Sequence, residues 1–143
     1  MADESSQVDE RQWAELMARA EVARGQAHAP YSRFFVGAAL LDANGRTFVG
    51  CNVENSSYGL SQCAERTAVC TAVSQGSRQF TALVVASEGG VAPCGACRQV
   101  LAEFARNVEL QVLLVDVTGQ RPSVRTDLSK LLPRQFHLDS RDR

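Results

Sequence analysis

The sequence lacks an apolar run long enough to span a membrane, and it lacks an excess of charge of either sign. Its 15 basic and 16 acidic residues give a formal net charge of −1, and the basic residues are scattered along the chain rather than grouped in a stripe. Proteins that bind long nucleic acids generally need such a stripe, because binding displaces counterions from the phosphates. The composition therefore argues against a membrane protein and against a nucleic-acid polymer as partner, and it favours a small-molecule ligand.

The sequence also lacks a recognisable targeting segment at its start. Residues Met1–Gln12 are polar and rich in acids, unlike a secretory signal or a transit peptide. Only five cysteines are present, an odd number, and two of them form a Cys-x-x-Cys pair. In a reducing compartment this spacing indicates metal or redox chemistry rather than a disulfide framework. We therefore expect a cytoplasmic protein.

Internal repeats, low-complexity segments and long linkers are absent as well. The 143 residues, 45% hydrophobic and 22% charged, are typical of one soluble domain with a single core. We expect one domain over residues 1–143, with flexible ends at residues 1–8 and 138–143.

Apolar and turn-forming residues predict a series of helices and strands. The predicted helices cover about residues 9–25, 63–76, 94–104 and 126–132, and the predicted strands cover residues 35–41, 47–53, 82–86 and 110–115. The turn signal Asp42-Ala43-Asn44-Gly45 joins the first two strands into a hairpin. Strands separated by helices indicate an α/β fold, with a partly parallel sheet and helices on both faces. A further short strand near the C-terminus fits this pattern but is not specified by it.

Three cysteines and a glutamate form the most informative pattern in the chain. Cys63-Ala64-Glu65 is followed about thirty residues later by Pro93-Cys94-Gly95-Ala96-Cys97. Both segments lie at predicted helix starts, where the helix dipoles stabilise thiolates. Three thiolates can hold a zinc ion and leave its fourth position open to water, which is the arrangement of a catalytic zinc site. The pattern matches a known signature of zinc-dependent nucleobase deaminases, in which a glutamate that is not a ligand moves protons.

Glu65 and Arg66 follow the first cysteine directly. Glu65 is placed to act as general base and then general acid at the open position. Three thiolates leave the zinc site with net negative charge, and Arg66 could offset it by donating hydrogen bonds to the sulfurs. On the sequence alone, a surface arginine of the helix is an equally good interpretation of Arg66.

Cys-x-x-Cys also occurs in structural zinc knuckles and in redox pairs. A structural zinc site normally needs four protein ligands. The remaining candidates, Cys51, Cys70, His28 and His137, do not have the spacing of a second knuckle. A redox pair would not account for Cys-Ala-Glu. We expect Cys51 and Cys70 to be small buried apolar residues.

In these and neighbouring motifs, the chain closely resembles the homotetrameric zinc-dependent cytidine deaminases, from about residue 10 to Phe136. The stretches that carry the resemblance are Ala29-Pro30-Tyr31-Ser32-Arg33-Phe34, Val36-Gly37-Ala38-Ala39-Leu40, Gly50-Cys51-Asn52-Val53-Glu54-Asn55, Tyr58-Gly59-Leu60, Cys63-Ala64-Glu65-Arg66-Thr67-Ala68 and Pro93-Cys94-Gly95-Ala96-Cys97-Arg98-Gln99-Val100. The resemblance implies a three-layer α/β/α sandwich around a mixed sheet of about five strands. It also implies one Zn²⁺ per subunit and hydrolysis of cytidine and 2′-deoxycytidine to the uridines and ammonia, in pyrimidine salvage.

The resemblance further implies roles for individual residues in binding the nucleoside. Phe34 would stack on the pyrimidine ring, and Asn52 and Glu54 would hold the ribose 3′-hydroxyl. The backbone of Ala64 and the carboxyl of Glu65 would read the base. Without the resemblance, Phe34 is more simply a core residue, and Asn52 and Glu54 form a solvated strand edge.

The resemblance also implies a homotetramer whose active sites are completed by neighbouring subunits. Phe136 is the candidate for the residue that reaches a neighbour's site. The preceding pair, Arg134-Gln135, is bulkier than the small pair often found there in the family.

Two other functions remain open from the sequence. One is deamination of a different cytosine nucleoside, either an antibiotic such as blasticidin S or a nucleoside with a larger N4 substituent. The other is a zinc-stabilised binding module without turnover. A carboxylate at the ribose 3′-oxygen, as implied for Glu54, would repel a phosphate there, so we expect free nucleosides rather than polynucleotides as substrates.

Overall fold

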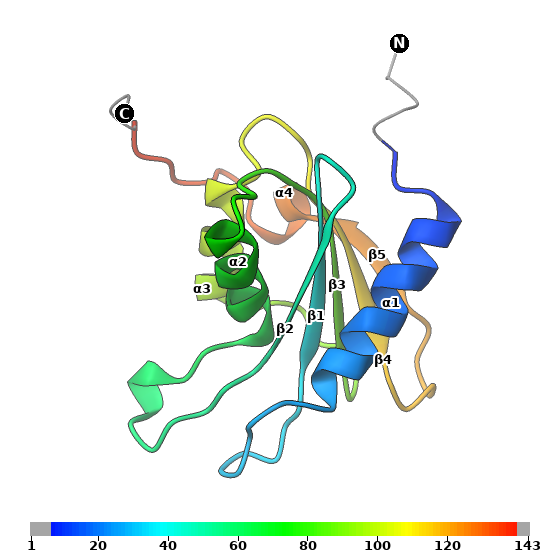
Figure 1. Ribbon diagram of the computed structural model, residues 1–143, viewed down its shortest axis with the longest axis vertical. Helices are drawn as coiled ribbons and strands as arrows, with labels where there is room; N and C mark the ends of the chain where they lie inside the picture. The colour runs from blue at the N-terminus through cyan, green and yellow to red at the C-terminus, as the bar shows by residue number, and fades with distance from the viewer. Residues whose placement is uncertain (1–6, 140–143) are drawn as a thin grey trace.

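The computed structural model describes residues 7–139, which form a five-stranded mixed sheet with helices on both faces (Figure 1). The strands are β1 (Gly37–Asp42), β2 (Thr47–Cys51), β3 (Phe80–Ser87), β4 (Gln111–Asp116) and β5 (Val124–Asp127), and the helices are α1 (Glu10–Arg24), η2 (Tyr58–Leu60), α2 (Ala64–Ser74), α3 (Gly95–Glu103) and α4 (Leu128–Leu131). The sheet order is β2-β1-β3-β4-β5, in which β3 and β4 are parallel and every other neighbouring pair is antiparallel. The predicted α/β/α sandwich with about five strands is confirmed.

Of the helices in the described part of the chain, α1 covers one face of the sheet by itself (Figure 1). Its apolar side chains Trp13, Leu16 and Ala20 are spaced to share one side of the helix, and all three are buried against the sheet. Asp9 caps the helix start by accepting a hydrogen bond from the backbone N–H of Gln12. The sequence predicted this helix to within a residue at each end.

The opposite face is covered by α2 and α3, which lie side by side (Figure 1). Helix α2 approaches β2 very closely at Gly50, where an added Cβ would lie 2.4 Å from the Ala68 nitrogen and 2.6 Å from the Ala64 oxygen. The small residues Ala64 and Ala68 are fully buried at this contact. Gly50 therefore fixes how near the first turn of α2 lies to the sheet, and with it the position of Cys63.

The segment that leads to α3 leaves the sheet at the carboxyl end of β3. Ser87 ends β3 and Asp116 ends the parallel strand β4, and these two residues are paired in the sheet register. In sheets of this kind, ligands bind outside the carboxyl ends of parallel strands. The loop of residues 88–94 therefore starts at the sheet edge where a site is expected.

The C-terminal part differs from its prediction. The predicted helix over residues 126–132 is wrong at its start, because Thr126 lies in β5, where it pairs with Val112 of β4. The helix is shorter, and Asp127 caps it by accepting a hydrogen bond from the Lys130 N–H. The additional C-terminal strand that the pattern allowed is β5.

The expectation that Cys51 and Cys70 are buried is also wrong. Cys51 is half-buried at the end of β2, and Cys70 is exposed. Cys70 lies on α2 between the buried residues Val69 and Ala72, on the side of the helix that faces away from the sheet. The expected flexible ends fall mainly on residues 1–6 and 140–143, which lie outside the described residues. Within residues 7–139, no helix combines the length and the apolar character needed to cross a membrane.

Candidate active site

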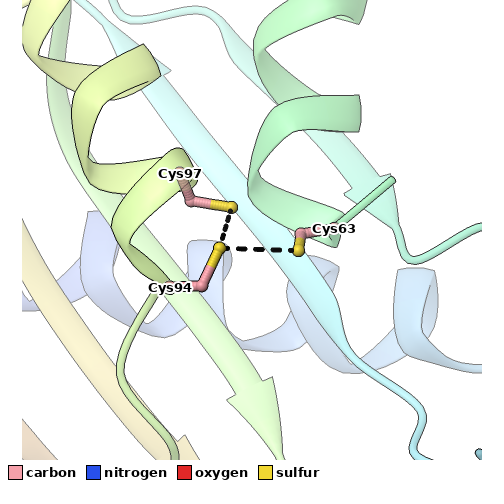
Figure 2. Close-up of side chains that lie close together, drawn as sticks. All are labelled: Cys63, Cys94 and Cys97. Atoms are coloured by element: carbon pink, nitrogen blue, oxygen red, sulfur yellow. Dashed lines mark hydrogen bonds between the residues drawn. The ribbon is translucent and has the colours of Figure 1, made fainter. Parts of the chain in front are cut away.

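The three predicted zinc ligands meet at the N-termini of α2 and α3 (Figure 2). Cys63 is the N-cap residue of α2, Cys94 is the N-cap residue of α3, and Cys97 is buried in the first turn of α3. The Sγ atom of Cys94 lies 3.8 Å from that of Cys63 and 3.4 Å from that of Cys97. All three sulfurs lie within 4.8 Å of one another.

These distances fit a tetrahedral zinc ion. Zinc–sulfur bonds of about 2.3 Å at tetrahedral angles place two sulfur ligands about 3.8 Å apart. Among residues 7–139, no fourth His, Cys, Asp or Glu joins this group of potential ligand atoms. Three protein ligands would leave one coordination position for water or substrate, as in catalytic rather than structural zinc sites.

Arg66 lies against the thiols and carries the positive charge of the site. Its Nη2 atom lies 3.5 Å from the Cys63 sulfur, and this contact raises the pKa of the guanidinium. The hydrogen bond between the Cys97 and Cys63 thiols, together with Arg66, lowers the pKa of Cys63 to about 5. The same thiol–thiol hydrogen bond and burial raise the pKa of Cys97. Arg66 and the thiol–thiol hydrogen bond therefore favour the thiolate at Cys63, whereas the pKa of Cys97 is shifted in the opposite direction.

Glu65 occupies the first turn of α2 and is only 4% exposed. Burial raises the pKa of its carboxyl, while a hydrogen bond with the Cys97 thiol acts in the opposite direction. A carboxyl with a raised pKa exchanges a proton more readily near neutral pH than an ordinary glutamate does. The geometry thus places the carboxyl that is predicted to transfer protons beside the predicted zinc ligands.

A cavity of about 250 Å³ opens at the thiols. Its walls are formed by Phe34, Val36, Asn52, Glu54, Ser61, Gln62, Cys63, Ala64, Glu65, Val91, Ala92, Pro93 and Cys94. The cavity therefore joins two of the three predicted ligands, Cys63 and Cys94, to Glu65 and to four of the five residues predicted to bind substrate, while Cys97 is buried behind the wall. A larger cavity of about 470 Å³ lies beside the C-terminal segment and contains none of them.

The polar residues Asn52 and Glu54 lie just beyond the end of β2. The Asn52 side chain accepts a hydrogen bond from the Val36 N–H at 2.9 Å and donates one to the Phe34 carbonyl at 2.7 Å. The Glu54 carboxylate accepts hydrogen bonds from the Tyr31 and Ser32 N–H groups at 3.0 and 3.1 Å and from the Ser32 hydroxyl. Both side chains therefore hold the segment that carries Phe34, in addition to facing the cavity.

Some residues of the site were not predicted from the sequence. Val91 and Ala92 form part of the cavity wall, and their only sequence signal is their position before Cys94. Ser32 contacts Glu54 across 22 positions of sequence, and no local pattern reports that contact. The place of Val91 and Ala92 in the wall and the contact between Ser32 and Glu54 both arise from segments that are distant in the sequence and meet in the fold.

Phe136 is the one predicted substrate-binding residue that does not line the cavity of its own chain. Its side chain is 64% exposed, and its carbonyl accepts a hydrogen bond from Gln99 Nε2 at 2.9 Å. Its role in completing the active site of a neighbouring subunit therefore stays a prediction.

A three-thiol site beside a buried glutamate, at the edge of a mixed sheet in an α/β/α sandwich, defines a zinc-binding deaminase of the nucleobase class. Residues 10–112 match the family described as "Cytidine and deoxycytidylate deaminase zinc-binding region". The chain belongs to the cytidine deaminase family.

Individual relatives agree over most of the chain. A cytidine deaminase of Sporosarcina psychrophila is 51% identical over 123 residues, which cover 85% of this chain and 88% of the relative. A cytidine deaminase of Mycobacterium tuberculosis is 44% identical over 129 residues, covering 89% and 91%. The crystal structure of the cytidine deaminase from Burkholderia pseudomallei superposes with a TM-score of 0.80 at 47% identity, covering 86% of this chain and 98% of that one. Cytidine deaminase activity follows from this similarity, and zinc is the metal that the matched region binds.

Proposed function

We propose that the chain hydrolyses cytidine and 2′-deoxycytidine to uridine and 2′-deoxyuridine, with release of ammonia. The observation that carries this proposal is one cavity whose wall includes Cys63, Cys94, the buried Glu65 and the polar residues Asn52 and Glu54. The third thiol, Cys97, lies directly behind this wall, with its sulfur 3.4 Å from that of Cys94. The thiols and Glu65 account for the reaction. Phe34, Asn52 and Glu54 account for the substrate.

Cys63, Cys94 and Cys97 would hold the metal in this proposal. A bound zinc ion supplies a Lewis acid that makes hydroxide available from water near neutral pH. Arg66 holds Cys63 as a thiolate and limits the negative charge that the metal experiences.

Glu65 carries the protons of the reaction. Its carboxylate accepts a proton from the attacking water and passes it to ring N3, while the water oxygen bonds to C4. The carboxylate then accepts the remaining proton from the new hydroxyl at C4 and delivers it to the amino group. The C4–N bond breaks to release ammonia, and C4 becomes the carbonyl carbon of uridine. The buried position of Glu65 supports both roles, because its raised pKa brings the protonated and ionised forms closer in free energy.

The cavity walls support a free nucleoside as substrate. Phe34 offers a ring face on which the base can stack. The backbone of Ala64 lies beside Glu65, where both can form hydrogen bonds with the polar edge of the base. Asn52 and Glu54 would bind the ribose 3′-hydroxyl. Negative charge on Glu54 disfavours a phosphate at that oxygen, so we expect polynucleotides to be poor substrates.

The proposed assembly is a cytoplasmic homotetramer in which Phe136 completes the site of a neighbouring subunit. The exposed side chains of Tyr58, Leu60 and Phe136, which are 77%, 65% and 64% exposed, support a contact surface between subunits. Light scattering on the purified protein measures the mass, and a fully active monomer would contradict this assembly.

The test of the proposed function is an ultraviolet absorbance assay on the zinc-loaded protein. Cytidine and 2′-deoxycytidine should be turned over, whereas a single-stranded oligonucleotide containing cytosine should not be at comparable efficiency. An N4-substituted cytidine and blasticidin S form the second arm, and preferential turnover of either would replace the proposed substrate. Binding of cytidine without any turnover would identify a zinc-stabilised binding module instead.

A further inference from the structure

The segment of residues 29–36 is the second part of the connection between α1 and β1, and it carries Phe34 to the cavity. It has no regular secondary structure from Pro30 to Val36, so its shape depends on contacts with other segments. The Asn52 side chain holds the C-terminal half of this segment through hydrogen bonds with the backbone of Phe34 and Val36. Glu54 holds its N-terminal half through Tyr31 and Ser32.

The hydroxyl of Ser32 lies between the two predicted substrate-binding residues. It donates a hydrogen bond to Glu54 Oε2, and it accepts one from the backbone N–H of Phe34 at 3.0 Å. One oxygen atom therefore connects the carboxylate predicted to bind ribose with the residue predicted to stack on the base. Ser32 itself is absent from the cavity wall.

Ser32 orients the oxygen atom of Glu54 that still has a free acceptor site. Within residues 7–139, Glu54 Oε1 accepts two backbone N–H groups, and Glu54 Oε2 accepts only the Ser32 hydroxyl. Because a carboxylate offers about four lone-pair sites, one site remains on Oε2 for a hydroxyl of the substrate. The Ser32 hydrogen bond orients that oxygen, and it is the leading cause that lowers the pKa of Glu54 and keeps it ionised.

We propose that Ser32 is a positioning residue that couples recognition of the ribose 3′-hydroxyl at Glu54 to the placement of Phe34 against the base. This inference rests on the proposed function. Without the Ser32 hydroxyl, Glu54 Oε2 loses its partner and the Phe34 N–H loses its acceptor, so both contacts to the nucleoside become less ordered together.

The test compares two substrates that differ only at the 3′-position, 2′-deoxycytidine and 2′,3′-dideoxycytidine. Ser32→Ala should lower kcat/KM on 2′-deoxycytidine by about tenfold to hundredfold, mainly through KM, because a hydrogen bond to a charged group is removed. On 2′,3′-dideoxycytidine, where no 3′-hydroxyl can bind Glu54, the loss should be less than about threefold. Ser32→Thr, which keeps the hydroxyl, should restore most of the activity.

The matched control is Ser123→Ala, an exposed serine in the connection between β4 and β5. It should leave both substrates unaffected. Equal losses on the two substrates with Ser32→Ala would show a general structural role and overturn the inference, as would the absence of any loss. Failure of the wild-type protein to turn over 2′-deoxycytidine would instead contradict the proposed function, so the two failures are distinguishable.

A binding measurement supplies a readout that does not depend on turnover. Calorimetry with the products 2′-deoxyuridine and 2′,3′-dideoxyuridine should show that Ser32→Ala weakens binding of the first clearly more than binding of the second, because only the contact with Phe34 is affected in the second. In a Glu54→Gln background, Ser32→Ala should add less than about threefold to the loss for 2′-deoxyuridine. Full additivity of the two substitutions would overturn the coupling.

Discussion

The carboxylate of Asp116 accepts a hydrogen bond from the backbone N–H of Gly89 at 3.0 Å, which ties the carboxyl end of β4 to the loop that leads to Cys94. The same carboxylate accepts hydrogen bonds from the Thr118 N–H and hydroxyl and from the Arg121 N–H. These contacts lower the pKa of Asp116 to about 2, with the Gly89 bond as the leading cause. A group outside the cavity thus holds the loop that forms part of its wall.

The stability that Asp116 contributes should depend on pH. Because its pKa is depressed in the folded state, the contribution is fully present above the ordinary value of 3.8 and is lost as the pH falls towards about 2. Asp116→Asn should therefore be less stable than wild type at pH 6, and the difference should narrow between pH 4 and pH 3. Urea unfolding of the zinc-free proteins measures this, with exposed Glu21→Gln as the control. A difference that stays constant over this range would contradict the assigned role.

Removal of the proton-transfer carboxyl should abolish most of the activity and leave the metal in place. Glu65→Gln should lower kcat by at least about 10²- to 10⁴-fold, the usual contribution of general acid–base catalysis. Zinc content, measured by elemental analysis, should stay near that of wild type because Glu65 is not a predicted ligand. A variant that keeps zinc and turns over cytidine at a near-normal rate would show that another group moves the protons.

The predicted ligands should differ from the remaining cysteines in their effect on zinc. Cys97→Ala removes a buried sulfur from the three-thiol group, so zinc should be lost and the thermal midpoint should fall. Cys70→Ala, at an exposed position of α2, should keep full zinc occupancy. Full occupancy in the Cys97 variant would remove that residue from the ligand set.

The close contact between β2 and α2 should tolerate no side chain at position 50. A Cβ atom in Gly50→Ala would lie 2.4 Å from the Ala68 nitrogen, so α2 must move away from the sheet. Overpacking of this kind costs about 1–3 kcal/mol or more, and the shift would also displace Cys63 and weaken zinc binding. Gly59→Ala, where an added Cβ meets nothing within 4 Å, is the matched control. Denaturant unfolding and a competing chelator measure the two effects.

The proximity of Cys94 and Cys97 and most of the fold could be predicted because their signals are local. Cys94 and Cys97 lie three positions apart at a helix start marked by Pro93, and helix geometry alone brings their sulfurs together. The α1 periodicity and the turn at Gly45 likewise depend on neighbouring residues. These features can be predicted from neighbouring residues, without reference to the rest of the chain.

The wrong or missing predictions concern contacts between distant segments. Thr126 resembles a helix start by sequence, but it becomes a strand residue because the edge of β4 is available for pairing. Cys70 is a small apolar residue by composition, but its place on the outer side of α2 decides its exposure. The link from Ser32 to Glu54 arises only when the residues after β2 reach the segment before β1.

The two walls of the cavity come from separate parts of the chain. Cys63, Cys94 and Glu65 belong to the starts of α2 and α3, whereas Phe34, Asn52 and Glu54 belong to segments 29–36 and 52–54. We expect substitutions in the latter segments to alter the preferred sugar without disturbing the sulfur ligands. Sugar preference and metal retention could then evolve independently in this scaffold, through single changes that leave the reaction chemistry intact.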